Sequence, residues 1–135
     1  MTLLEQFKNA REVYISLINE KKDEIISEIL KDLSTKFPGL KQGSIVGYTP
    51  SFNDGDVCEH WSEVDISDER SIVAETFEDE VEENNLTSSE TRAIEMELEL
   101  IDLILTESEG TNYQFAFVVI DGEIKFETGY YDCGY

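Results

Sequence analysis

The stretch that decides the fold is residues 113–130, YQFAFVVIDGEIKFETGY. Large apolar side chains alternate with small or polar ones on both sides of Asp121-Gly122. Successive side chains of a strand point to opposite faces, so this alternation predicts two strands with one face on a core. An Asp-Gly pair between two such runs is a strong signal for a tight turn. Residues 112–131 are therefore predicted to form a β-hairpin.

The segment before this hairpin predicts a helix over residues 88–106. Thr87 and Glu90 have the spacing of a capping box, which satisfies backbone N–H groups at a helix start. Apolar residues recur at three- and four-residue spacing, which places them on one face of the helix. These residues are Ile94, Leu98, Ile101 and Leu105.

A second hairpin is predicted over residues 44–66. Its first arm is 44–50, its turn is 53–55 (Asn-Asp-Gly), and its second arm runs from Asp56 to about Ile66. Asn, Asp and Gly tolerate the positive φ angles that tight turns need. The alternation in the second arm is visible but imperfect.

The first part of the chain, residues 1–37, predicts a long helix that Pro38-Gly39 ends. The polar stretch 19–22 leaves open whether this helix is continuous or broken in two. Its apolar residues again recur at three- and four-residue spacing. They include Leu3, Phe7, Ala10, Tyr14, Leu17, Ile18, Ile25, Ile29 and Leu33.

Residues 67–85 allow two interpretations. They could form a strand followed by a loop, or an acidic helix that Ser67 caps and that turns inward Ile72, Val73, Thr76, Phe77 and Val81. On the helical interpretation, residues 67–106 make one acidic helical region. The predicted architecture is then α+β: a four-stranded antiparallel sheet from two hairpins, covered on one face by two or three helices including the long N-terminal one. A chain of 135 residues suits a single domain over 1–135.

Charge is distributed very unevenly along the chain. Residues 1–50 hold seven acidic and seven basic side chains, so the whole net charge of −21 lies in residues 51–135. Direct binding to nucleic acid or to an anionic membrane is excluded as the expected function, because those partners would be repelled. The partners that the charge permits are basic proteins, metal cations or polyamines.

The cysteine content and the apolar runs favour a cytoplasmic protein. Two cysteines, Cys58 and Cys133, are too few for a disulfide framework. The first residues lack the pattern of a signal peptide, and no apolar run approaches the roughly 20 residues that span a bilayer. We therefore expect free thiols in a reducing compartment, and a single Cys58–Cys133 disulfide is the alternative.

Residues 48–58 read Tyr-Thr-Pro-Ser-Phe-Asn-Asp-Gly-Asp-Val-Cys. This Tyr-Thr-Pro-x-Phe-Asn-Asp-Gly-Asp-x-Cys motif resembles a pattern in uncharacterised proteins of tailed phages and some bacteria. The resemblance implies a phage or prophage origin. It brings no known activity and no catalytic residues.

The same stretch contains groups that could bind a metal. Asp54, Asp56, Cys58 and His60 are close in sequence, and a thiolate with an imidazole suits zinc. The alternative is a purely structural role, in which the Asp residues stabilise the turn and Cys58 is a small buried apolar residue. No second close pair of Cys or His completes a zinc site, so no metal or other cofactor is the primary expectation. A Cys58–His60 thiol enzyme is weaker still, because no third catalytic group can be located.

The remaining candidate site is a surface of regularly spaced carboxylates. Neighbours at i and i+4 on a helix lie about 5–6 Å apart, a spacing comparable to that of DNA phosphates. Such a surface could bind at a site that normally binds nucleic acid. The alternative is that it is only a solvated acidic face without a binding role. The residues expected to contact a partner are Glu75, Glu78, Asp79, Glu82, Glu83, Glu95, Glu99 and Asp102.

The preferred function is a non-enzymatic acidic interaction protein of phage origin, which binds and inhibits a basic, nucleic-acid-binding host protein as a DNA mimic. One alternative is a small metal-binding or catalytic domain that uses the Asp54, Asp56, Cys58 and His60 cluster. Another alternative is a structural or assembly protein that forms oligomers through its first helix.

Overall fold

The computed structural model describes residues 2–49, 60–66, 73, 76–77, 82–110 and 112–131. The elements, in chain order, are α1 (Leu3–Lys36), β1 (Gln42–Tyr48), β2 (Trp61–Asp65), α3 (Ser88–Glu109), β3 (Tyr113–Ile120) and β4 (Glu123–Gly129). The predicted α+β class with a long N-terminal helix is confirmed. None of the helices described here is long and apolar enough to cross a lipid bilayer.

One antiparallel sheet contains all four strands in the order β2-β1-β3-β4. The hairpins β1-β2 and β3-β4 join because β1 pairs with β3, where Ile45 lies opposite Phe115. In the β3-β4 turn, Asp121 and Gly122 have φ angles of 51° and 80°, the left-handed conformation of a tight hairpin turn. The merged pair of hairpins predicted from the sequence is therefore confirmed, and β2 is an edge strand.

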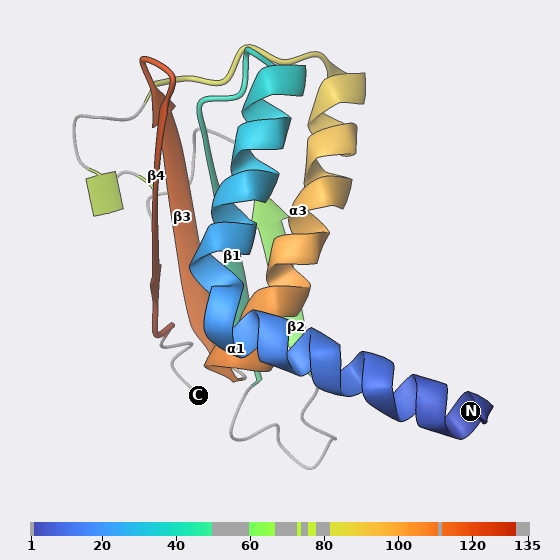
Figure 1. The fold of residues 1–135 in the computed structure, drawn as a ribbon. Coiled ribbons are helices and arrows are strands. Elements are labelled where there is room, and N and C mark those ends of the chain that lie inside the picture. The colour runs from blue at the N-terminus through green and yellow to red at the C-terminus, as the bar shows by residue number, and fades with distance from the viewer. Residues whose placement is uncertain are drawn as a thin grey trace.

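Figure 1 shows α1 and α3 side by side on one face of the sheet, over the main core. The opposite face is covered too. Val73 is buried against Ala116 and Val118, and Phe77 packs on the same small cluster. Val73 and Phe77 are helical, so the helical interpretation holds for these residues of the 67–85 segment. Helices α1 and α3 thus cover one face, and the helical residues Val73 and Phe77 pack on apolar side chains of the other face.

The central strands β1 and β3 fit together by side-chain size. Gly43 lies opposite Phe117, and Gly47 lies opposite Tyr113. A Cβ atom at Gly47 would overlap the Tyr113 ring, and a Cβ at Gly43 would overlap the Phe117 ring. Both aromatic side chains are fully buried. The glycines therefore make the room that these two rings occupy under the helices.

The helix α1 is continuous over 34 residues, so the polar stretch 19–22 does not break it. Its buried residues are Ile18, Ile26, Leu30 and Leu33, all from residue 18 onward. Figure 1 shows that the helix bends and that its N-terminal part points away from the sheet and α3. Thr2 caps the start by accepting the N–H of Glu5.

The helix α3 begins at the predicted capping box. The Thr87 hydroxyl accepts the N–H of Glu90 at 3.2 Å, and the Glu90 carboxylate accepts the N–H of Thr87 at 3.0 Å. The helix then runs three residues beyond the predicted end, to Glu109. Near that end, Glu109 forms an ion pair with Lys22 of α1, which ties the two helices together where the packed half of α1 begins.

Candidate functional site

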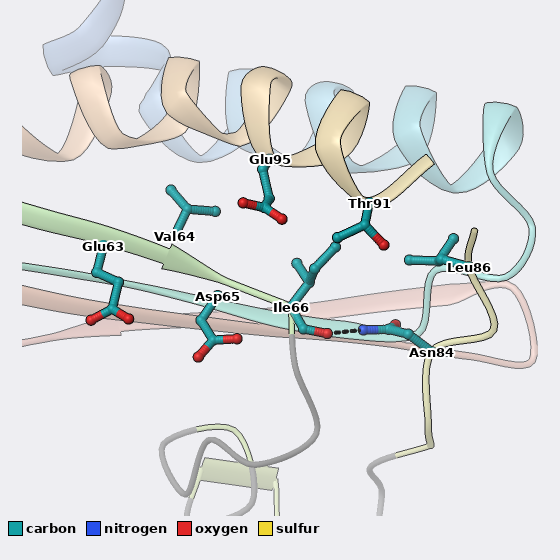
Figure 2. Close-up of a pocket in the computed structure, with 8 residues that line it drawn as sticks. All are labelled: Glu63, Val64, Asp65, Ile66, Asn84, Leu86, Thr91 and Glu95. Carbon is teal, nitrogen blue, oxygen red and sulfur yellow. Dashed lines mark hydrogen bonds between the residues drawn. The ribbon is translucent and has the colours of Figure 1, made fainter. Parts of the chain in front are cut away.

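An open groove of about 540 Å³ lies between the edge strand β2 and helix α3 (Figure 2). Four consecutive residues of the groove come from β2 and the residue after it, so the groove follows the strand. The lining residues are Glu63, Val64, Asp65, Ile66, Asn84, Leu86, Thr91 and Glu95.

The carboxylates of this groove lie on the two faces of β2. Val64 and Ile66 pack on the helix-side core, so alternation turns Glu63 and Asp65 to the other face. Glu95 projects from α3 toward the strand, as Figure 2 shows. The groove thus combines negative charge with the apolar side chains between the carboxylates. Long basic side chains fit such a surface, because their hydrocarbon stems pack on apolar groups while their charged ends meet carboxylates.

Asn84 fixes one end of the groove. Its side-chain oxygen accepts the N–H groups of Lys41 and Gln42 at 2.6 and 3.0 Å, and its amide nitrogen donates to the carbonyl of Gln42 at 3.1 Å and to that of Ile66. All four hydrogen-bonding positions of the amide are used. Asn84 therefore has a structural role: it joins the start of β1, the end of β2 and the approach to α3.

A polar network lies at the other end of the sheet. The buried Tyr113 hydroxyl donates to Asp102, is 2.9 Å from the hydroxyl of Thr106 and 3.4 Å from His60 Nε2. His60 Nδ1 is 3.0 Å from the Thr49 hydroxyl. Burial, together with the hydrogen bond to Asp102, raises the pKa of Tyr113 well above its usual value. The hydroxyl therefore stays protonated at neutral pH and joins α3 to the sheet.

The predicted partner-binding residues fall into four groups. Glu82, Glu83 and Glu99 are exposed, and Glu95 is half-buried in the groove. Asp102 is half-buried and accepts the Tyr113 hydrogen bond, so it belongs to the network. Glu75, Glu78 and Asp79 lie outside the described residues.

For the alternative metal site, only His60 is described, and its ring nitrogens face Thr49 and Tyr113. Asp54, Asp56 and Cys58 lie outside the described residues. Within the ranges described, no group of three His, Cys, Asp or Glu side chains is arranged to hold a metal ion.

Glu63 and Asp65 were not among the residues expected from the sequence to bind a partner. Only their position distinguishes them from the other acidic residues. They lie on an edge strand beside α3, and the strand order that shows this cannot be read from local sequence patterns. No protein-family model, no curated protein and no solved structure matches this chain.

Proposed function

We propose that this protein is a non-enzymatic, strongly acidic interaction protein that binds a basic segment of another protein. The observation that carries the proposal is the groove between β2 and α3, where Glu63, Asp65 and Glu95 surround apolar side chains. The groove lies in the part of the chain that holds the whole net charge of −21. A field of this size attracts basic partners and raises their rate of association.

The position of the groove favours an extended segment as the bound element. An edge strand presents backbone N–H and C=O groups away from its sheet, and extended peptides bind such edges by adding a strand. Lys or Arg side chains at alternate positions of that segment would reach Glu63 and Asp65 on one face, and a basic side chain at an intervening position would reach Glu95 on the other face.

The target class follows from the kind of surface that an acidic protein occupies. Nucleic-acid-binding proteins have basic surfaces built for regularly spaced phosphates. A protein that covers such a surface with carboxylates excludes the nucleic acid and inhibits its partner. A phage-encoded protein acting on a host protein is consistent with the motif at residues 48–58.

The test is a pull-down from nuclease-treated host lysate at about 0.15 M salt, where the Debye length is about 8 Å. We expect a basic nucleic-acid-binding protein to be retained, and added duplex DNA to displace it. Replacing the groove carboxylates, in the triple variant Glu63→Gln, Asp65→Asn and Glu95→Gln, should weaken binding at least about tenfold, or about 1.4 kcal/mol.

The matched control removes three acidic groups from the electrically neutral part of the chain. Glu20, Asp23 and Glu28 are exposed on α1, and the triple variant Glu20→Gln, Asp23→Asn and Glu28→Gln should keep near-normal binding. If both triple variants bind as tightly as the original protein, the groove does not contact the partner and the proposal fails.

A further inference from the structure

The N-terminal half of α1 carries a large apolar surface that the fold does not bury. We call residues 3–17 the arm. The first buried residue of α1, Ile18, follows directly after it. Ile15 is half-buried, but six large apolar side chains of the arm have exposed fractions that run from 41% at Tyr14 to 83% at Leu3. These side chains are Leu3, Leu4, Phe7, Val13, Tyr14 and Leu17.

The spacing of these residues is that of a coiled-coil seam. Leu3, Phe7, Ala10, Tyr14 and Leu17 follow one another at intervals of four, three, four and three residues. This is the a/d pattern of a heptad repeat, in which a narrow apolar stripe faces a second helix. Leu4 and Val13 lie beside this seam and widen the exposed apolar surface around it.

A helix of this length needs a partner for its stability. Isolated helices shorter than about 12–15 residues are marginal in water, because most helix stability in proteins comes from packing of the apolar face. The arm has a cap at Thr2 and continues into the packed half of α1, but its apolar side chains remain exposed. A partner that covers the stripe would supply the missing burial.

The charge of the arm allows that partner to be a second copy of the chain. Its charged residues are Glu5, Lys8, Arg11 and Glu12, which sum to zero. Two arms can therefore approach without net repulsion, although the whole chain carries −21. A basic partner would gain no electrostatic attraction here, in contrast to the groove.

The size of the exposed surface also fits a dimer. The six large apolar side chains expose on the order of 700 Å² together, close to the roughly 800 Å² that each partner buries in a standard protein interface. Pairing of two identical stripes is self-complementary, so it closes as a symmetric dimer and does not continue into a fibre.

We propose that the arm pairs with the arm of a second copy as an antiparallel two-helix coiled coil. The acidic domain is attached at the C-terminal end of each arm. Parallel pairing would place the two domains next to each other, whereas antiparallel pairing separates them by the arm length of about 22 Å, well beyond the Debye length at physiological salt. This inference does not depend on the proposed function.

Sedimentation equilibrium of the full chain tests the dimer. We expect a dimer for the original protein, and a dissociation constant that falls as salt is raised, because salt screens repulsion between the acidic domains. Phe7→Glu places a charge in the seam and should shift the protein to monomer, with at least a hundredfold weaker association. A monomer at all salt concentrations, or a Phe7→Glu protein that still dimerises, would overturn the proposal.

The control is Met96→Glu on α3. Met96 and Phe7 have nearly the same exposed fractions, 67% and 68%, so both substitutions add a charge at an equally exposed apolar site. Met96→Glu should leave the dimer intact; if it also gives monomers, pairing through the arms alone is wrong. Circular dichroism checks that both variants keep their folded domain.

The orientation is tested with Leu3→Cys in a protein whose Cys58 and Cys133 are replaced by Ser. Parallel pairing brings the two copies of position 3 together, and oxidation would then give a disulfide-linked dimer. Antiparallel pairing separates them, so we expect monomers on a non-reducing gel. The opposite salt dependence of the two contacts separates this proposal from the proposed function, since binding of a basic partner weakens as salt rises.

Discussion

The two halves of α1 belong to one continuous helix with similar apolar periodicity, yet they have opposite environments. In the half from residue 18 onward, the side chains of Ile26, Leu30 and Leu33 are almost fully buried in the core that α1 shares with the sheet and α3. In the arm, Phe7 and Leu3 are among the most exposed apolar residues described. Periodicity predicts that a helix has an apolar face, but it does not say which molecule covers that face.

The largest expected effect separates the two halves directly. Leu30→Ala deletes a side chain that is 1% exposed and should lower the free energy of unfolding by about 2–5 kcal/mol, through lost burial and the cavity left behind. Phe7→Ala should change the same quantity by less than about 0.5 kcal/mol when the protein concentration is kept well below the dissociation constant of the proposed dimer. Urea denaturation followed by circular dichroism measures both.

Equal losses for Leu30→Ala and Phe7→Ala would show that the arm is packed against its own domain. The comparison between the halves would then be wrong, and so would the inference of a second copy. The control is the m-value of each variant. An m-value equal to that of the original protein shows that unfolding exposes the same amount of surface in all three proteins.

The next effect concerns the anchoring of α3 to the sheet. Tyr113→Phe removes the hydroxyl that donates to Asp102 and should cost about 1–2 kcal/mol. The raised pKa of Tyr113 gives this contribution a pH dependence. The unfolded chain loses the proton near pH 10, whereas the folded chain retains it to higher pH, so the contribution is complete below about pH 10 and is lost above it.

Free energies of unfolding at pH 8 and pH 11 therefore test the role of Tyr113. The stability difference between the original protein and Tyr113→Phe should narrow at pH 11. A constant difference would mean that the hydroxyl is not held protonated in the folded state. The other tyrosines are identical in the two proteins, so their contributions cancel in the difference.

The smallest effect compares the two helix starts. Thr87→Ala removes the capping box of α3, which is attached to the core, and should cost about 1 kcal/mol. Thr2→Ala removes the cap of the arm and should cost the dilute protein less than about 0.5 kcal/mol, because the arm opens without unfolding the domain. Amide hydrogen exchange should accordingly show faster exchange in residues 3–17 than in α3, and equal protection would contradict this.

The parts of the fold that could be predicted from the sequence carry strong local signals. Asp121-Gly122 specified its turn, and Thr87 with Glu90 specified the start of α3. Nearby residues decide these features through backbone conformation and short-range hydrogen bonds. The helical state of Val73 and Phe77 was left open because an acidic segment with few apolar residues fits more than one pattern.

The parts that could not be predicted depend on strand order and on which elements meet. The groove exists because β2 is an edge strand beside α3, and Glu63 gains its place there only after β1 has paired with β3. Asp102 has helical spacing with Glu95 and Glu99, so the sequence placed it with the exposed acids. The hydroxyl of Tyr113, 11 residues away in sequence, draws it into the network.

The size match between β1 and β3 has a consequence for how the chain can change over evolution. Because each ring occupies the volume that a glycine leaves empty, neither residue of a pair can vary alone: a larger residue at Gly47 demands a smaller one than Tyr113, and the same holds for Gly43 and Phe117. If β1 shifted by two residues relative to β3, Ile45 would lie opposite Phe117 or Tyr113, whose rings need a glycine at that position. Divergent relatives should therefore show these positions changing in pairs, so that the alignment of the two strands is inherited as a pattern of volumes.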